Sequence, residues 1–129
     1  MIHELKILPE YFEAVCKGSK TFEVRRDDRG FEVGDIIKLK EWTKGKYTGR
    51  EITVKVTYIL RDSDYCKDGY CILGTRLFGY WRKLADFPEL WFCGMCGVPY
   101  STRNSFCSCC GSLMNYSDNM EDADNERSD

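Results

Sequence analysis

The sequence contains no long apolar stretch, few prolines and a single histidine. No segment approaches the roughly 18 consecutive apolar residues of a membrane-spanning helix, and Met1–Lys6 does not resemble a signal peptide. We therefore expect a cytoplasmic protein without a membrane partner. With 43% hydrophobic and 31% charged residues, most of the chain has the composition of a folded domain and not of a disordered one.

Most of the chain also lacks a large excess of charge of one sign. Residues 1–114 hold 18 Lys and Arg against 15 Asp and Glu, an excess of +3, whereas residues 115–129 hold one Arg against six acidic residues. Mild basicity permits nucleic-acid binding but limits the share of the affinity that phosphate contacts supply. We predict that residues 115–129 form a disordered acidic tail, which either only adds solubility or contacts a basic partner.

Residues 1–79 are predicted to form a mainly β (α+β) domain with one helix near its start. Pro9 suits the first helical position, Phe12, Val15 and Cys16 share a face that we expect to be buried, and Gly18 can end the helix. Alternating apolar and polar residues predict five strands, over residues 5–8, 21–25, 36–42, 50–60 and 70–77. Most links are too short for a parallel crossover, so we expect a largely antiparallel sheet curled into a small β-barrel.

Two copies of a Cys-x-x-Cys-Gly motif lie in residues 91–114. Each spacing lets one tight turn present two thiolates to one ion, and the glycine after the second cysteine allows amide N–H groups to point at the sulfurs. Two such turns supply the four ligands of a closed tetrahedral site. We predict a zinc ribbon with one structural zinc ion, with iron as the alternative metal, and with these ligands: Cys93, Cys96, Cys107 and Cys110.

The other cysteines show no comparable pattern. Cys109 could replace Cys107 or Cys110, although only the latter pair reproduces the first turn. Cys66 and Cys71 flank a predicted turn and could pair or bind a second ion, but we favour unpaired thiols.

Residues 80–90 connect the predicted domain to the ribbon. This stretch and the residue after it are too apolar for a free linker, since they contain Trp81, Leu84, Phe87, Leu90 and Trp91. We expect a short helix that packs against the barrel or the ribbon.

The N-terminal part resembles a known group of domains. Gly18–Arg25 matches the Gly-x-Lys-x-x-Glu-x-Arg motif of ASCH domains, which belong to the PUA-like superfamily. Residues 2–77 also resemble an uncharacterised ASCH-like family of bacteria and their phages, through His3–Lys6, Pro9 with Phe12, Asp28–Arg29, Val33–Asp35, Glu41–Trp42, Tyr47–Glu51 and Gly69–Gly74. The resemblance implies a small β-barrel and, beside the helix, a cleft that binds RNA or a modified nucleotide.

Six residues are candidates for that cleft: Lys6, Lys20, Glu23, Arg25, Arg29 and Trp42. Lysine and arginine can hold phosphates, a carboxylate can accept a hydrogen bond from a base amino group, and tryptophan can stack on a base. Alternatively, Glu23 and Arg25 form an ion pair on a solvated face, and Trp42 belongs to the core or its rim. The lone histidine, His3, is more often structural than a ligand in such a position.

Three functions remain open. The first is an RNA- or nucleotide-binding module, in which the ribbon adds a second contact surface. The second is hydrolysis of an acetylated cytidine, which a small ASCH family performs with a lysine and, three residues later, a threonine. Lys20 matches, but Glu23 stands in the threonine's place, and the two side chains could act as acid and base. The third is an adaptor that binds a protein partner through the ribbon.

Overall fold

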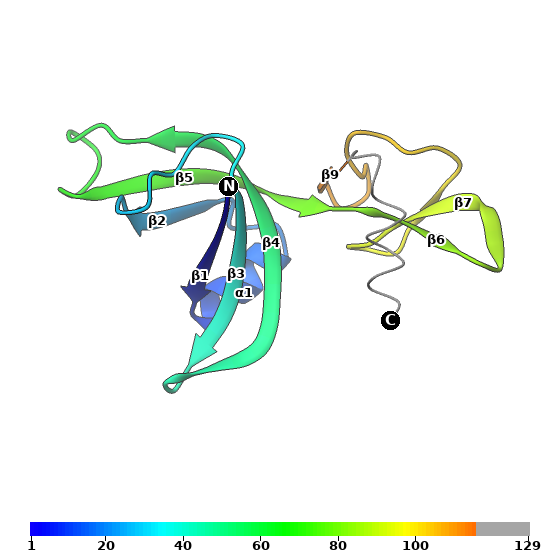
Figure 1. The fold of residues 1–129 in the computed structure, drawn as a ribbon, viewed down its shortest axis with the longest axis horizontal. Coiled ribbons are helices and arrows are strands. Elements are labelled where there is room, and N and C mark those ends of the chain that lie inside the picture. The colour runs from blue at the N-terminus through cyan, green and yellow to red at the C-terminus, as the bar shows by residue number, and fades with distance from the viewer. Residues whose placement is uncertain (116–129) are drawn as a thin grey trace. The chain divides into compact units, whose positions relative to one another are not determined.

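The computed structural model describes residues 1–115, so the predicted disorder of the tail after Asn115 lies outside the described residues. The chain divides into two compact units, one from Met1 to Leu77 and a second that begins at Phe78 (Figure 1). Among the described residues, no helix has the length and the apolar character that crossing a membrane requires.

Strands dominate the first unit, as predicted. Three of its pairings are antiparallel, joining β2 with β5, β3 with β4, and β4 with β5. Its elements are β1 (Ile2–Ile7), α1 (Pro9–Cys16), β2 (Phe22–Arg26), β3 (Ile36–Thr43), β4 (Lys46–Leu60) and β5 (Tyr70–Gly79).

The predicted closed barrel is wrong, because the sheet stays open. Its strand order is β1-β3-β4-β5-β2, and no ladder joins the end strands β1 and β2 within residues 1–115. Side chains already bond to backbone oxygens of these strands: Arg29 donates to Glu4, and Lys20 donates to Phe22. β1 pairs in parallel with β3, and residues 8–35 form the long crossover that parallel strands need.

One apolar cluster holds the first unit together. α1 contributes Phe12 and Val15, and burying such a side chain stabilises by about 1.5–3 kcal/mol. Cys16, predicted to be buried beside them, is exposed, because it lies in the last turn of a helix whose buried stripe ends at Val15. The other members are Leu5, Ile7, Phe31, Ile37, Leu39, Val54, Val56, Cys71 and Leu73.

The connection between β3 and β4 is shorter than the gap of seven residues between the predicted strands 36–42 and 50–60. Lys44 and Gly45 form a two-residue turn, and both have positive φ angles, 53° and 81°. Such a turn follows the right-handed twist of a hairpin and favours glycine. β4 therefore begins at Lys46, opposite Thr43.

Short strands also form the second unit. β6 (Trp81–Leu84), β7 (Phe87–Cys93) and β8 (Pro99–Tyr100) make one sheet in that order. β9 (Leu113–Met114) pairs in parallel with the last two residues of β5.

The short helix predicted for residues 80–90 is wrong. The chain turns after Leu84, and Leu84 lies opposite Phe87 across a hairpin of β6 and β7. The hairpin places Trp81 opposite Cys93, where the indole is fully buried. Burial of this ring in the second unit favours the strand over a helix, a tertiary effect that local composition does not reveal.

A second, smaller apolar cluster surrounds the cysteines. The Trp81 indole N–H donates to the Asn104 backbone oxygen at 3.0 Å, so its buried polar group is satisfied. A core this small supplies little folding free energy, and a bound ion is the usual compensation. The buried members are Trp81, Cys93, Cys107 and Met114, and Tyr80, Trp91, Met95, Tyr100 and Cys110 pack against them.

Candidate cleft and candidate metal centre

β2 turns its acidic side chain, Glu23, inward and its apolar side chains outward. Glu23 is 2% exposed, whereas Phe22 and Val24 are 46% and 55% exposed. The predicted division of β2 into two faces holds, because neighbouring residues on a strand face opposite sides. Glu23, however, does not lie on a solvated face. Apolar side chains left in water beside a buried carboxylate point to a functional surface.

Two cations hold this buried carboxylate. Arg25 donates to Glu23 Oε1 from Nη2 at 2.7 Å and from Nε at 3.2 Å. The Lys20 ammonium contacts Glu23 Oε2 and donates to the Phe22 carbonyl at 2.6 Å. A buried carboxylate needs such partners, since removing it from water costs several kcal/mol.

These side chains line a cavity at the open side of the sheet. Its volume is about 440 Å³. Because β1 and β2 are the end strands, the cavity lies where a closed barrel would have joined them. The lining carries three cations and one carboxylate, which favours an anionic ligand. It consists of Lys6, Ile7, Leu8, Tyr11, Lys20, Phe22, Glu23, Val24 and Arg25.

Two of the six predicted cleft residues lie outside this lining. The Lys6 ammonium is 3.9 Å from the centre of the Trp42 ring, so Trp42 contacts a lining residue without lining the cavity itself. Arg29 donates to the Glu4 carbonyl at 3.1 Å. The structure brings together the other four: Lys6, Lys20, Glu23 and Arg25.

Sequence reasoning missed the apolar part of the lining. Phe22 and Val24 form the apolar face of a predicted strand, a pattern that usually marks the core. Tyr11 precedes the buried Phe12 on a helix that buries one stripe only, so its exposure could have been predicted from helical spacing.

The lone histidine belongs to a different, buried cluster. His3 Nε2 lies 2.8 Å from Asp35 Oδ2, and the His3 ring meets Phe31 edge-on at 4.8 Å. Burial opposes ionisation of Asp35, but hydrogen bonds from His3 and from the Glu32 N–H outweigh it and lower the pKa of Asp35. His3 thus has the structural position that we favoured.

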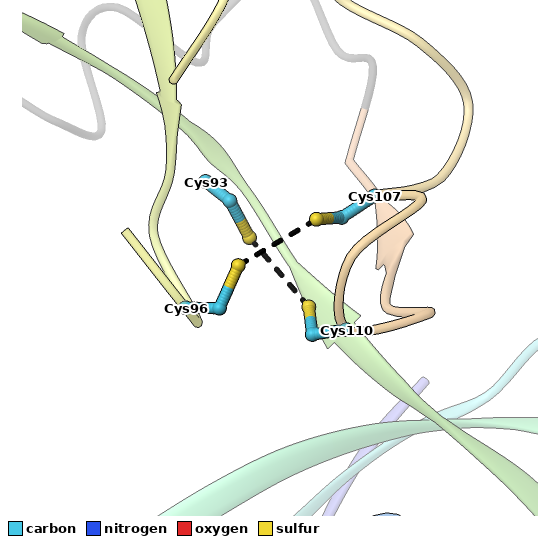
Figure 2. A group of neighbouring side chains, drawn as sticks. All are labelled: Cys93, Cys96, Cys107 and Cys110. Carbon is cyan, nitrogen blue, oxygen red and sulfur yellow. Dashed lines mark hydrogen bonds between the residues drawn. The ribbon is translucent and has the colours of Figure 1, made fainter. Parts of the chain in front are cut away.

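Four cysteine sulfurs converge in the second unit (Figure 2). Those of Cys93, Cys96, Cys107 and Cys110 all lie within 4.8 Å of one another. The Cys93–Cys110 and Cys96–Cys107 sulfurs are 3.8 and 3.6 Å apart. A tetrahedron with metal–sulfur bonds of about 2.3 Å has edges of about 3.8 Å. The four side chains can therefore bind one metal ion.

Both Cys-x-x-Cys turns use their glycine in the same way. Gly97 and Gly111 have φ angles of 81° and 78°, and their N–H groups donate to the Cys93 and Cys107 carbonyls at 2.8 and 2.7 Å. The first turn also lets the Met95 N–H donate to Cys93 Sγ at 3.4 Å. Such N–H···S bonds offset part of the negative charge of clustered thiolates.

Three of the clustered thiols, those of Cys93, Cys96 and Cys107, have shifted pKa values. Burial raises the pKa of Cys93 and of Cys96. Burial also opposes ionisation of Cys107, but hydrogen bonds from the Tyr100 hydroxyl, at 3.4 Å, and from backbone N–H groups outweigh it and lower the pKa of Cys107 to about 6. Since a thiol binds metal as its thiolate, metal binding must release protons from Cys93 and Cys96 and strengthens as the pH rises.

Comparisons with known proteins address the first unit. Residues 2–75, more than half of the chain, match the model of a domain of unknown function, DUF3850. The chain belongs to the DUF3850 family. A similar protein is the "Uncharacterized 12.9 kDa protein in GpA 3'region" of Escherichia phage P2, which is 40% identical over 67 residues. These residues are 52% of this chain and 62% of the phage protein, so the chain spans less than two thirds of its relative's length.

The DUF3850 match contains the whole cleft and none of the clustered cysteines. All lining residues lie between Lys6 and Arg25, whereas the cysteine cluster begins at Cys93. The P2 protein supports the predicted association with phages. Membership of DUF3850 in the ASCH and PUA-like groups stays a prediction.

The remaining cysteines of this DUF3850 protein lie outside the four-sulfur group. Cys109 is exposed, and its N–H donates to the Tyr100 hydroxyl at 3.2 Å. Cys66 and Cys71 are buried free thiols, as we favoured. The structure therefore brings the sulfurs of Cys107 and Cys110, and not that of Cys109, close to the two cysteine sulfurs of the first turn.

Proposed function

We propose that the cleft binds a nucleotide, either free or as part of RNA. The supporting observation is the composition of the cavity, whose lining carries three cations and one carboxylate while the rings of Tyr11 and Phe22 stay exposed. A nucleotide combines the two chemistries that this lining matches, an anionic phosphate and a flat aromatic base.

The phosphate would lie against Lys20 and Arg25. Arg25 uses Nε and Nη2 on Glu23, which leaves Nη1 for a ligand. Arginine binds phosphate with paired hydrogen bonds, and a side chain that is held in advance loses less entropy on binding. Glu23 then anchors two cations instead of accepting a hydrogen bond from a base.

The base would stack on an exposed ring. The centres of the Tyr11 and Phe22 rings lie 5.8 and 5.0 Å from the Lys20 ammonium. Stacking on an aromatic side chain contributes about 1–3 kcal/mol per base. Phe22 takes the role first assigned to Trp42, because Trp42 is half-buried beside Lys6.

A binding assay with matched variants tests this proposal. Nucleoside 5′-monophosphates and short single-stranded RNAs are titrated into the full chain with and without Arg25→Ala, and calorimetry measures the affinity. Arg25→Ala is expected to weaken binding at least about tenfold. Lys46→Ala, which removes an exposed cation outside the lining, should change it less than about twofold.

Equal weakening by both substitutions would mean that charge alone attracts the probes and that the cleft is not the site. If no probe binds to the parent protein, the proposal fails, and the adaptor reading, in which the cysteine-rich unit binds a protein partner, takes its place.

The contact between Lys20 and Glu23 favours one alternative, hydrolysis of an acetylated cytidine in the same cleft. An ammonium–carboxylate pair can exchange a proton with an attacking water. Thr21, the threonine next to Lys20 in the sequence, is exposed and lies outside the lining. Incubation with acetylated cytidine decides this point: acetate release that Lys20→Ala abolishes would establish the reaction, and unchanged substrate would rule it out.

We infer that the four cysteines bind one zinc ion and that its role is structural. Four sulfur ligands close a tetrahedral site and leave no position for a substrate, and thiolates suit zinc. Elemental analysis of the purified protein is expected to find one zinc per chain, retained in Cys109→Ser and lost in Cys110→Ser. Iron in place of zinc, or equal retention in both variants, would contradict this assignment.

A further inference from the structure

The peptide groups of β2 point alternately toward β5 and away from it. In an antiparallel ladder, every second residue turns its N–H and C=O to the partner strand. The Thr75 N–H donates to the Thr21 carbonyl and the Asp27 N–H to the Gly69 carbonyl, and both pairs continue the β2–β5 register. The odd-numbered residues of β2 therefore face β5, and the peptide groups of Val24 point off the open edge of the sheet.

A cation caps one backbone oxygen on each end strand, whereas within residues 1–115 no cation bonds to the peptide groups of Val24. The Phe22 carbonyl accepts from Lys20 at 2.6 Å. On β1, the other end strand, the Glu4 carbonyl accepts from Arg29 at 3.1 Å. Val24 lies in the end strand β2 and lines the cavity, so its N–H and C=O are available to a ligand there.

We propose that the N–H and C=O of Val24 pair with the Watson–Crick edge of the bound base. A peptide N–H and C=O on one side of a strand match the adjacent acceptor and donor of such an edge. This inference rests on the proposed nucleotide binding and narrows its ligand. The base must be unpaired, because pairing would occupy the same edge, so the ligand is a free nucleotide or a single-stranded segment.

A free sheet edge can also take a peptide strand, but β2 suits a base better. An added strand needs several successive backbone groups, and the Phe22 carbonyl is already bonded to Lys20. A base needs the pair of groups from one residue. The exposed Phe22 ring and the Arg25 guanidinium lie on either side of Val24 along the chain and match a base face and a phosphate.

One change in the ligand and one in the protein test the pairing. Uridine and guanosine 5′-monophosphates are compared with their 3-methyluridine and 1-methylguanosine counterparts. In these, a methyl group replaces the hydrogen of the ring N–H on the Watson–Crick edge. Val24→Pro removes the backbone N–H, and proline is tolerated in an end strand where that N–H faces away from the ladder. Val24→Thr keeps the N–H and the branched shape and serves as the control.

Methylation of the base and Val24→Pro are each expected to weaken binding about tenfold, because each leaves a polar group without its partner. Val24→Thr should stay within about threefold of the parent. Equal affinity for methylated and unmethylated nucleotides would overturn the role of Val24 while leaving nucleotide binding in place. If the protein binds none of the four nucleotides, both the proposed nucleotide binding and the role of Val24 would be overturned. If Val24→Pro does not fold, the methylated pairs decide alone.

A uridine hexanucleotide separates the two sources of the ligand. Tighter binding of the single-stranded hexanucleotide than of uridine 5′-monophosphate would identify RNA, and equal or weaker binding would identify the free nucleotide. Equal binding of the hexanucleotide alone and paired in a duplex would contradict the pairing with Val24, since the duplex hides the Watson–Crick edge.

Discussion

At the scale of single residues, the first unit contains three buried carboxylates, and each of them has polar partners. Glu23, Asp35 and Glu41 are 2%, 4% and 3% exposed, and each accepts hydrogen bonds from named donors. All three belong to the motifs that suggested the family resemblance. Two of them lie outside the cavity lining, so these motifs mix structural residues with candidate site residues, and a motif match alone does not identify a binding residue.

Replacing Glu23 by Gln is expected to lower the free energy of unfolding by about 1–3 kcal/mol, because Lys20 and Arg25 lose their charged partner. Denaturant unfolding followed by circular dichroism measures this change. Glu10→Gln removes an exposed carboxylate of α1 and should stay within about 0.5 kcal/mol. An equally small effect of both substitutions would mean that the ion pairs of Glu23 add no net stability.

Glu41 should make stability depend on pH. Hydrogen bonds from Arg50, at 2.7 and 3.0 Å, and from the Thr48 hydroxyl hold the pKa of Glu41 below its ordinary value of 4.5. Since the folded pKa is the lower one, the stabilisation is complete above about pH 5 and disappears as the pH falls through the folded pKa. Thermal melts between about pH 7 and pH 3 should lose stability more steeply for the parent than for Glu41→Gln. If the melting temperatures of the two proteins fell in parallel with pH, Glu41 would not be the source of the pH dependence.

At the scale of elements, local patterns located the strands of the first unit apart from the first half of β1, but they did not identify the buried face of β2. β3 was expected over residues 36–42 and spans Ile36–Thr43. In β2, alternation separated the two faces correctly, yet the buried one carries Glu23, because Lys20 and Arg25 neutralise it. That neutralisation comes from side-chain geometry, which hydrophobic periodicity does not contain.

The two cysteine turns were the most predictable elements, because each one is specified within five residues. The spacing of the thiolates and the positive φ of the following glycine are both local requirements. The hairpin of β6 and β7 depends instead on burying Trp81 against Cys93 and Cys107. These contacts join residues that are far apart in the sequence. They determine the conformation of residues 80–90, which their apolar composition alone did not predict.

Gly111→Ala should weaken the proposed binding of zinc by the four cysteines. The φ of 78° at Gly111 costs an alanine about 1–2 kcal/mol, which corresponds to roughly a 5- to 30-fold loss of affinity. Competition with a chromophoric chelator measures this loss. Gly111→Asn should lose less, since asparagine tolerates this conformation better. Equal losses for the two variants would show that the backbone conformation is not the cause.

At the scale of the whole molecule, the two units owe their stability to different sources. The first has an extended apolar cluster that α1 and the sheet share, whereas the buried members of the apolar cluster in the second are two cysteines, Trp81 and Met114. Removing the proposed zinc ion should therefore unfold the second unit and leave the first one folded.

Tryptophan fluorescence can follow this difference, because Trp42 belongs to the first unit and Trp81 and Trp91 to the second. A zinc chelator is expected to shift the emission to longer wavelength as the fully buried Trp81 enters water. The shift should persist in Trp42→Phe and shrink in Trp81→Phe. Circular dichroism that falls to the value of an unfolded chain would mean that the first unit also depends on the metal.

The open sheet was the feature of the whole molecule that the sequence could not reveal. Strand count and short links are compatible with a barrel, and closure depends on whether the two end strands pair. Lys20 and Arg29, both predicted as ligand residues, also donate to backbone oxygens of those strands. These bonds join residues up to 25 positions apart and depend on the finished fold.

The parallel pairing of β1 has a consequence for synthesis. Every residue of β1 lies opposite the residue 34 positions later, from Ile2 opposite Ile36 to Ile7 opposite Glu41. At about 5–20 residues per second, a ribosome completes the partner about 2–7 s after β1 itself. During that interval Leu5 and Ile7 have no strand beside them, so β1 must wait for β3 before it enters the sheet.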